Sequence, residues 1–296
     1  MSATHASPII VLGAARSGTK LLRGMLAEAA GVAMVPYDVN YLWRAADPAC
    51  QDDELCAQKL TSQVADRLRR SLNRAAGLSK NARGTFVEKS VSNVLRIPYV
   101  LRALPEARFV HLLRDGRDVT ESAMRCWQSP PAAGYALRKA FSFPWAQCFS
   151  YGVRQAGRSL IRLVGRGPAP CWGPCYRGMQ HDARNLPLAE VCAWQWRRCV
   201  EAYERDRQLL APERRVEVRY EELVSQPTET LTRVLNELAL PARSVSIDAA
   251  AHGVKPDLRG GHRRLAAAQR TAIDGVLGLA LVRHGYLNSP THRSAA

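Results

Sequence analysis

The stretch that decides the fold is PIIVLGAARSGTK, residues 8–20. Its aliphatic residues run to Gly13, and a helical pattern begins at Thr19 and continues to about Ala30. This order predicts a strand, a tight loop that contains glycine, and a helix. The first N–H groups of a helix have no partners within it, and the helix dipole is positive at that end. The loop therefore suits a phosphate group.

The alternation of strand and helix continues along most of the chain. Aliphatic and β-branched runs predict further strands at 85–87, 108–113 and 215–219. Apolar residues at helical spacing predict helices at 52–76, 93–104, 119–127, 188–210 and 228–238, and a closing helix that ends near residue 284. Strands that alternate with helices are typical of an α/β fold with a parallel sheet flanked by helices.

Residues 129–187 interrupt this pattern, because Pro, Gly and aromatic residues replace the regular spacing. We interpret them as an insertion or lid rather than a separate domain, so that residues 1–296 form one domain. A basic loop at 255–264 precedes the closing helix.

The composition excludes several classes of protein. A chain of 296 residues, 47% of them hydrophobic, can bury a large core, which excludes wholesale disorder and a disulfide-stapled miniprotein. No uncharged apolar run approaches the roughly 20 residues of a membrane-spanning helix. The apolar stretch 8–15 is too short for a signal peptide. We therefore expect a soluble, cytoplasmic protein.

The charge balance favours anionic partners. The chain has 42 basic and 26 acidic residues, a net charge of +16. Such an excess suits nucleotides, polyanionic saccharides, nucleic acids or acidic membrane surfaces, and the charge alone does not choose among them.

The eight cysteines are too sparse for a secreted disulfide framework, so we expect free thiols. A zinc site formed by Cys171, Cys175, His181 and Cys192 is an alternative interpretation. A CxxxC spacing is unusual for zinc and no second pair follows, so we expect no metal.

Residues 13–20 have the spacing of the phosphate-binding loop of nucleoside triphosphatases, GxxxxGK[ST], with the last two residues inverted. In that loop the lysine reaches the β- and γ-phosphates and the hydroxyl binds magnesium. Here Thr19 precedes Lys20, which suits a triphosphate and its metal poorly, and no convincing Walker B strand follows. A nucleotide kinase with an aberrant loop is the alternative enzyme.

Two motifs resemble those of sulfotransferases that use 3′-phosphoadenosine 5′-phosphosulfate (PAPS). Residues 16–19, RSGT, resemble the loop that binds the 5′-phosphosulfate, although many members have a second threonine where this chain has Lys20. Arg114 closes the predicted strand 108–113, and Ser122 follows eight residues later, like the arginine and serine that bind the 3′-phosphate in that family. A guanidinium fork and a hydroxyl suit a dianionic monophosphate.

Two further segments resemble the same family. Residues 87–90, VEKS, resemble the EK[ST] segment of its carbohydrate and tyrosylprotein branches. Residues 219–223, RYEEL, followed by Pro227, resemble its RYE[DE]L element, which precedes a proline and a helix. The resemblance extends from residue 8 to about residue 240 and implies a P-loop-NTPase-like fold.

The resemblance also implies which residues form the site. Lys89 and Arg16 would stabilise the charge that develops on the transferred group and the leaving oxygen. Asp38 lies in YDVNYL, residues 37–42, which resembles a heparan-type segment whose glutamate acts as the base, although an aspartate is one methylene shorter. The histidines are poorer base candidates, and His111 fits a core position. The residues implied in co-substrate binding are Arg16, Ser17, Gly18, Thr19, Lys20, Leu21, Arg114, Ser122, Tyr220 and Arg259.

The resemblance therefore implies an enzyme that transfers a sulfuryl group from PAPS to an acceptor hydroxyl without a metal. A saccharide or glycolipid is the favoured acceptor, because aromatic residues in and beside the insertion could stack on sugar rings; these are Trp127, Trp145, Trp172 and Tyr176. A phenol, a peptide tyrosine and a small metabolite stay open as acceptors. We expect no nucleic-acid partner, and contact with an anionic membrane surface is left open.

A non-catalytic polyanion-binding module is the alternative from a different class. It would explain the net charge of +16, but it has no need for an arginine and a serine at the spacing of 114 and 122.

Overall fold

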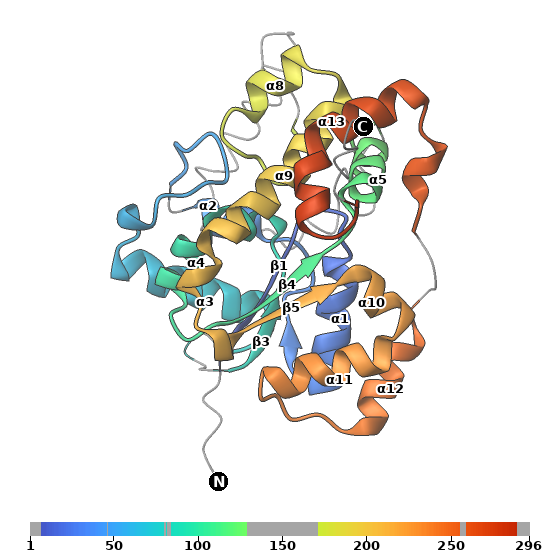
Figure 1. Cartoon of the computed structure of the whole chain (residues 1–296). Coiled ribbons are helices and arrows are strands. Elements are labelled where there is room, and N and C mark those ends of the chain that lie inside the picture. The colour runs from blue at the N-terminus through green and yellow to red at the C-terminus, as the bar shows by residue number, and fades with distance from the viewer. Residues whose placement is uncertain are drawn as a thin grey trace.

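The computed structural model describes residues 7–45, 47–79, 81, 84–128, 171–254 and 259–288. At its centre is a five-stranded parallel sheet with the order β2-β3-β1-β4-β5 (Figure 1). The strands are β1 Ile9–Leu12, β2 Ala33–Met34, β3 Phe86–Glu88, β4 Arg108–Leu113 and β5 Arg215–Arg219. The sheet confirms the predicted α/β architecture. β2 has only two residues, too few for a recognisable pattern, and is the strand that the sequence does not predict.

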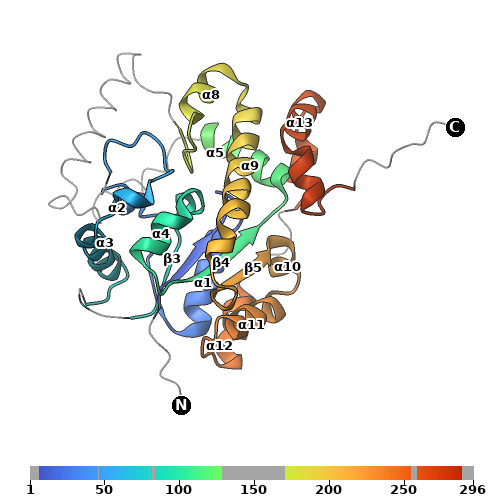
Figure 2. The ribbon, with the colours of Figure 1, turned by 60° about the vertical axis from the view of Figure 1, so that its left-hand side comes forward.

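Helices cover both faces of the sheet (Figures 1 and 2). The alternation of side chains along β1 requires this, because Ile9 and Val11 pack on one face, Ile10 and Leu12 pack on the other, and all four are fully buried. One face is covered by α1 Thr19–Ala30, α10 Tyr220–Ser225, α11 Pro227–Glu237 and α12 Ser244–His252. The other is covered by α3 Ser62–Ala75, α4 Ile97–Ala103, α5 Gly116–Gln128, α9 Leu188–Asp206 and α13 Ala267–Arg283.

Several predicted helix boundaries are wrong, for local reasons. The helix expected over 52–76 begins only at Ser62, where the Thr61 hydroxyl accepts a hydrogen bond from the Val64 N–H at 3.3 Å and caps it. The helix expected over 93–104 begins as 3₁₀ turns and becomes α-helical at Ile97, with a proline in its first turn. The sequence does not predict α12.

The remaining short elements connect the layers. They are α2 Asn40–Arg44, α8 Met179–Asn185, and the 3₁₀ segments η1 Ala57–Lys59, η2 Val91–Arg96, η3 Arg207–Leu209, η4 Pro212–Arg214 and η5 Gly261–Arg264. The helix expected over 188–210 is α9 followed by η3, and α5 begins three residues before the predicted helix at 119.

Most of the predicted insertion, residues 129–170, lies outside the described residues, as do residues 255–258 of the basic loop. Within 171–187 the expectation of irregular structure is wrong where α8 forms. No helix in the described part of the chain is both long and apolar enough to cross a membrane. The cytoplasmic location stays a prediction.

The topology brings four strand ends to one edge of the sheet. In a parallel sheet all carboxyl ends lie on the same side, and a ligand site forms beyond them where the chain connections diverge to either side. At this edge β1 leads into the loop 13–18, β3 into Lys89, β4 into Arg114 and β5 into Tyr220.

Candidate active site

The loop between β1 and α1 adopts backbone conformations that its sequence permits. Gly18 is the N-cap of α1 with φ +93°, in the left-handed region where glycine carries little cost. A Cβ on Gly18 would lie 2.5 Å from a ring carbon of Tyr220, so the ring occupies the space that any side chain would need. Arg16 has φ +73°, which is uncommon for a residue with a side chain and marks strain within this loop.

The structure brings both Arg114 and Ser122 to this loop. Arg114 donates a hydrogen bond from a terminal guanidinium nitrogen to the Arg16 carbonyl at 3.1 Å, and its guanidinium lies 4.1 Å from the centre of the Tyr220 ring. The Arg16 Nε donates to Ser122 Oγ at 3.0 Å. Trp196 holds the backbone of Arg114 in place, because its indole N–H donates a hydrogen bond to the Arg114 carbonyl at 3.1 Å. The two positions predicted to bind one phosphate therefore share one edge and both contact the loop.

The loop also presents polar groups suited to an anion. The Ser17 side chain is 1% exposed, and its hydroxyl has no hydrogen-bond partner among the described residues. Gly18 offers no side chain to cap α1, and the first turn of α1 has no acidic residue. A buried hydroxyl without a partner is costly, and uncapped N–H groups at a helix start attract an anion. The loop therefore fits a phosphate or phosphosulfate group.

The other predicted loop residues play smaller parts in this geometry. Thr19 is buried, and Lys20 is exposed at the start of α1. The Leu21 side chain packs against the core beneath α1, so only its backbone N–H can contribute to the site.

The second glycine-rich loop, residues 259–264, packs against α5. Asp118 accepts hydrogen bonds from the Gly260 N–H at 2.8 Å, the His262 N–H at 3.2 Å and the His262 ring at 2.6 Å. Burial would raise the pKa of Asp118, but these hydrogen bonds outweigh it, so the pKa lies below its ordinary value. The loop is thus tied to the helix that carries Ser122, and Arg259 is exposed at its start.

Asp38 and Lys89 are neighbours. The Lys89 Nζ lies 3.5 Å from Asp38 Oδ2, and the side chains are 13% and 22% exposed. The same carboxylate oxygen accepts the Val91 N–H at 3.1 Å, and the other accepts the Asn40 N–H at 3.1 Å. An exposed strand-end lysine is therefore not what the structure shows. A carboxylate could act as a base here, and the neighbouring lysine is a cation that could stabilise negative charge.

A buried polar network lies beneath this pair, and the sequence analysis does not identify it. Glu88 is fully buried, accepts a hydrogen bond from the Ser90 hydroxyl, and accepts one from the Asn93 amide at 2.8 Å. Burial raises the pKa of Glu88 to about 7, against the lowering effect of the Ser90 hydrogen bond. Ser90 in turn accepts the Val39 N–H at 3.2 Å, so the network reaches the residue after Asp38. The available signal was the cluster of polar residues directly after a buried strand.

Other sequence-based alternatives have clear outcomes. His111 is buried in β4 and stacks on Tyr203 with ring centres 3.5 Å apart; burial lowers its pKa to about 3, as expected for a core residue. Tyr176 is 2% exposed and donates its hydroxyl proton to Asp182 at 2.7 Å, so the expectation that it could stack on a sugar is wrong. Trp127 and Trp172 are half-buried, and Trp145 lies outside the described residues.

Among the described residues, no group of three or more His, Cys, Asp or Glu side chains could hold a metal ion. Because residues 171, 175, 181 and 192 are all described, the structure does not support the zinc alternative.

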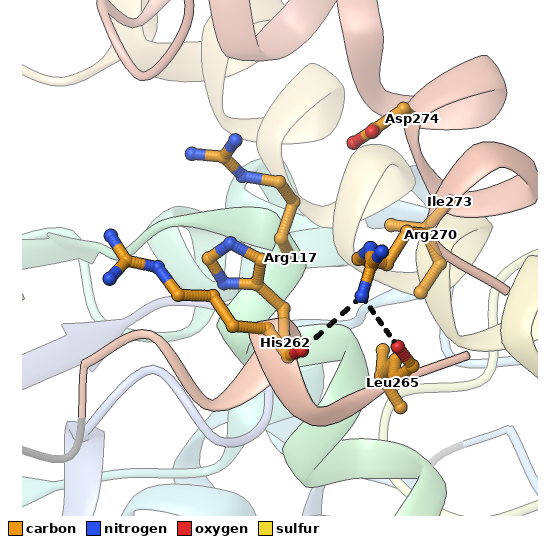
Figure 3. A pocket seen from close by; sticks show the side chains of 7 residues that line it. Arg117, His262, Leu265, Arg270, Ile273 and Asp274 are labelled. Carbon is orange, nitrogen blue, oxygen red and sulfur yellow. Dashed lines mark hydrogen bonds between the residues drawn. The ribbon is translucent and has the colours of Figure 1, made fainter. Parts of the chain in front are cut away.

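A pocket of about 210 Å³ lies between loop 259–264 and α13 (Figure 3). Arg117, Arg263, Arg270 and Asp274 are among its lining residues, and Arg270 donates to the carbonyls of residues 263 and 265 at 3.3 and 2.8 Å. None of the residues predicted for nucleotide binding lines this pocket, so we place the candidate site at the strand ends instead.

Comparison with known proteins bears on this geometry. The model of a family described as "Sulfotransferase family" matches residues 8–156 and 164–244. No protein with a curated description matches the sequence.

The solved structures that share the fold include two sulfotransferases. The sulfotransferase domain from the Synechococcus PCC 7002 olefin synthase is 16% identical with a TM-score of 0.54, and the alignment covers 98% of this chain and 98% of that one. Sulfotransferase STF9 from Mycobacterium avium is 16% identical with a TM-score of 0.50, over 95% of this chain and 77% of that one.

Proposed function

The chain belongs to the sulfotransferase family, and we propose that it transfers a sulfuryl group from PAPS to an acceptor hydroxyl through residues at the carboxyl ends of β1, β3 and β4. One observation carries this proposal. Arg114 and Ser122 both contact the backbone or side chain of Arg16, in the same loop that presents the buried Ser17 hydroxyl. A donor with two separate anionic groups fits this arrangement.

In this proposal the two ends of the nucleotide bind to different elements. The loop 16–19, with the first N–H groups of α1, holds the 5′-phosphosulfate. Arg114, Ser122 and the loop that begins at Arg259 hold the 3′-phosphate, and Tyr220 lies against the nucleoside. The Ser122 hydroxyl accepts from Arg16 and still has its own proton to donate to a phosphate oxygen.

The proposed reaction is an in-line displacement at sulfur. Asp38 removes the proton from the acceptor hydroxyl, and the acceptor oxygen forms a bond to sulfur. The bond between sulfur and the bridging oxygen breaks, and that oxygen leaves with 3′,5′-bisphosphoadenosine. Lys89 and Arg16 stabilise the negative charge that builds on the leaving oxygen. The transferred group carries less charge than a phosphoryl group, so side-chain cations can suffice without a metal.

We further propose a saccharide or glycolipid as the acceptor. The resemblance of residues 87–90 to the carbohydrate and tyrosylprotein branches and the carboxylate beside Lys89 support it. Of the aromatic residues predicted to stack on a sugar, Trp127 and Trp172 are half-buried.

Thermal unfolding with three ligands separates this function from the alternatives. We expect 3′,5′-bisphosphoadenosine in EDTA to raise the Tm strongly, because a ligand that binds only the folded state stabilises it. ATP with magnesium serves as the test for a kinase, and a sulfated polysaccharide as the test for a polyanion-binding module. A larger shift with either of these than with the bisphosphate would overturn the proposal.

The acceptor itself can be found with ³⁵S-labelled PAPS and an extract of the source cells. A labelled saccharide would support the acceptor class, and a labelled protein or phenol would replace it without affecting the assignment of the donor.

A further inference from the structure

Asp53 is a buried carboxylate at the meeting point of three chain segments. Its side chain is 2% exposed. One oxygen accepts the Asn40 side-chain amide at 2.9 Å, and the other accepts the Ser92 hydroxyl at 2.7 Å and the Cys175 N–H at 2.8 Å. The Asp53 N–H also donates to the Cys175 carbonyl at 2.7 Å. Each carboxylate oxygen is therefore engaged by a segment other than its own.

Two of these segments carry the proposed chemistry. Asn40 follows the base by two residues, and its N–H donates to Asp38 Oδ1 at 3.1 Å. Ser92 belongs to η2, the segment that follows Lys89 and gives the Val91 N–H to Asp38. Asp53 thus connects the segment that carries Asp38 to the segment that follows Lys89.

The third segment, residues 171–176, belongs to the C-terminal part of the predicted insertion 129–187. Cys175 lies shortly after residue 171, the first described residue beyond Gln128. The same stretch is fixed a second time, because the Gln195 amide donates to the carbonyls of Trp172 at 2.7 Å and Pro174 at 2.8 Å. The paired hydrogen bonds with Asp53 therefore connect this stretch to the segments that carry Asp38 and Lys89.

The charge of Asp53 is balanced by two arginines. It lies 3.5 Å from an Arg44 nitrogen and 4.0 Å from an Arg96 nitrogen. Arg96 is fully buried and donates to Asn40 Oδ1 at 2.7 Å, so the arginine and the aspartate hold the same asparagine amide from opposite ends. A buried ion network of this kind orders its segments strongly only while every member is present.

We propose that Asp53 is a positioning residue for sulfuryl transfer: it holds the Asp38 segment in register with Lys89 and couples both to residues 171–176. This inference rests on the proposed function, in which Asp38 is the base. Asp53 itself is 2% exposed and satisfied by protein groups, so it acts through Asp38 rather than on the substrate.

Asp53→Asn tests this with little change of shape. In Asp53→Asn the new side-chain NH₂ group would face groups that themselves donate hydrogen bonds. Arg44 and Arg96 would also lose one negative countercharge. Asp52→Asn is the matched control, since Asp52 is half-buried and accepts the Glu54 N–H at 2.9 Å within its own loop. If Asp53→Asn does not fold, Asn40→Ala removes the same link to the base segment and serves in its place.

Hydrogen exchange measures the link directly. In Asp53→Asn we expect amide exchange to rise by about tenfold or more at residues 38–42 and 171–176, with residues 13–23 unchanged, because the lost hydrogen bonds are local to these segments. The Kd for 3′,5′-bisphosphoadenosine should stay within about twofold of the parent value. Exchange that is unchanged in both segments, or raised everywhere, would overturn the proposal.

Rates separate a positioning role from a general loss of structure. With a methyl glycoside as the probe acceptor, an alcohol that keeps its proton at neutral pH until a base removes it, release of the bisphosphate from PAPS should fall about 10- to 100-fold in Asp53→Asn, through kcat. In an Asp38→Asn background the same change should cost nothing further, because the group that it positions is gone. If Asp53→Asn lowered kcat by the same factor in the Asp38→Asn background as in the parent enzyme, the proposal would be contradicted. Normal turnover by Asp38→Asn alone would refute the base instead, and the exchange result would still decide the role of Asp53.

Discussion

Replacing Gly18 by alanine tests the packing of the phosphate loop. The position has φ +93°, and a left-handed conformation costs a residue with a side chain about 1–2 kcal/mol. The added Cβ would lie 2.5 and 2.7 Å from two carbons of the Tyr220 ring, and such overpacking costs about 1–3 kcal/mol. Together the expected destabilisation is about 2–5 kcal/mol, against a total stability of roughly 5–15 kcal/mol for a typical protein.

Gly24→Ala is the matched control within the same helix. Its Cβ would meet nothing within 4 Å, and its backbone is helical, so the substitution should stabilise α1 by about 0.5–1 kcal/mol. Urea denaturation of the three proteins gives the free energy of unfolding. Gly18→Ala should have a clearly lower midpoint than the parent, and Gly24→Ala an equal or higher one.

The ring contact also predicts a loss of nucleotide binding. If Tyr220 or the loop shifts to admit the methyl group, Arg114 loses the ring on which it stacks, and the affinity for 3′,5′-bisphosphoadenosine should fall. If Gly18→Ala had the same free energy of unfolding and the same affinity for the bisphosphate as Gly24→Ala, the geometry of the loop would be refuted.

Three further substitutions give separate tests. Asp38→Asn should lower turnover by about 100-fold or more while the affinity for the bisphosphate stays within about twofold, because only the base is lost; near-normal turnover would remove Asp38 from that role. Ser122→Ala should weaken bisphosphate binding by about tenfold, the value of one hydrogen bond to a charged group, and calorimetry would contradict this if the Kd were unchanged. His111 has a folded pKa of about 3 and an ordinary unfolded pKa, so the unfolded chain binds the extra proton between these values. Stability should therefore fall by about 1.4 kcal/mol per pH unit as the pH drops from 6 to 4, and His111→Phe should remove that slope; equal slopes in both proteins would show that His111 is not buried as a neutral ring.

The architecture could be predicted because its signals are local. The run 8–13 and the strand 108–113 are aliphatic enough to be read as buried strands, and the glycines between them and the following helices mark the loops. The family named from the motifs at 16–19, 114 and 122 is confirmed by the family model. Arg114 and Ser122 could be paired through the resemblance, in which an arginine that closes a strand is followed eight residues later by a serine on the next helix; in the structure these are the residue directly after β4 and the middle of α5.

The support of the site could not be predicted, because it depends on contacts between distant segments. Asp53 meets Ser92 and Cys175 only through the folded chain, because they lie 39 and 122 positions further along the sequence. Nothing in the spacing of Glu88 and Asn93 distinguishes a buried network from a polar turn. Short elements such as β2 carry too few residues for a pattern, and their placement follows from pairing with β3.

The central claim is that the site at the carboxyl ends of the strands recognises a separate phosphate on the 3′ position of the nucleoside. Titration calorimetry with 3′,5′-bisphosphoadenosine and with adenosine 5′-phosphate tests it most directly, since the two ligands differ by that phosphate alone. Two charge-assisted hydrogen bonds from Arg114 and Ser122 amount to about 3 kcal/mol, so we expect the bisphosphate to bind at least about 100-fold more tightly. Equal affinities for the two nucleotides would contradict the account.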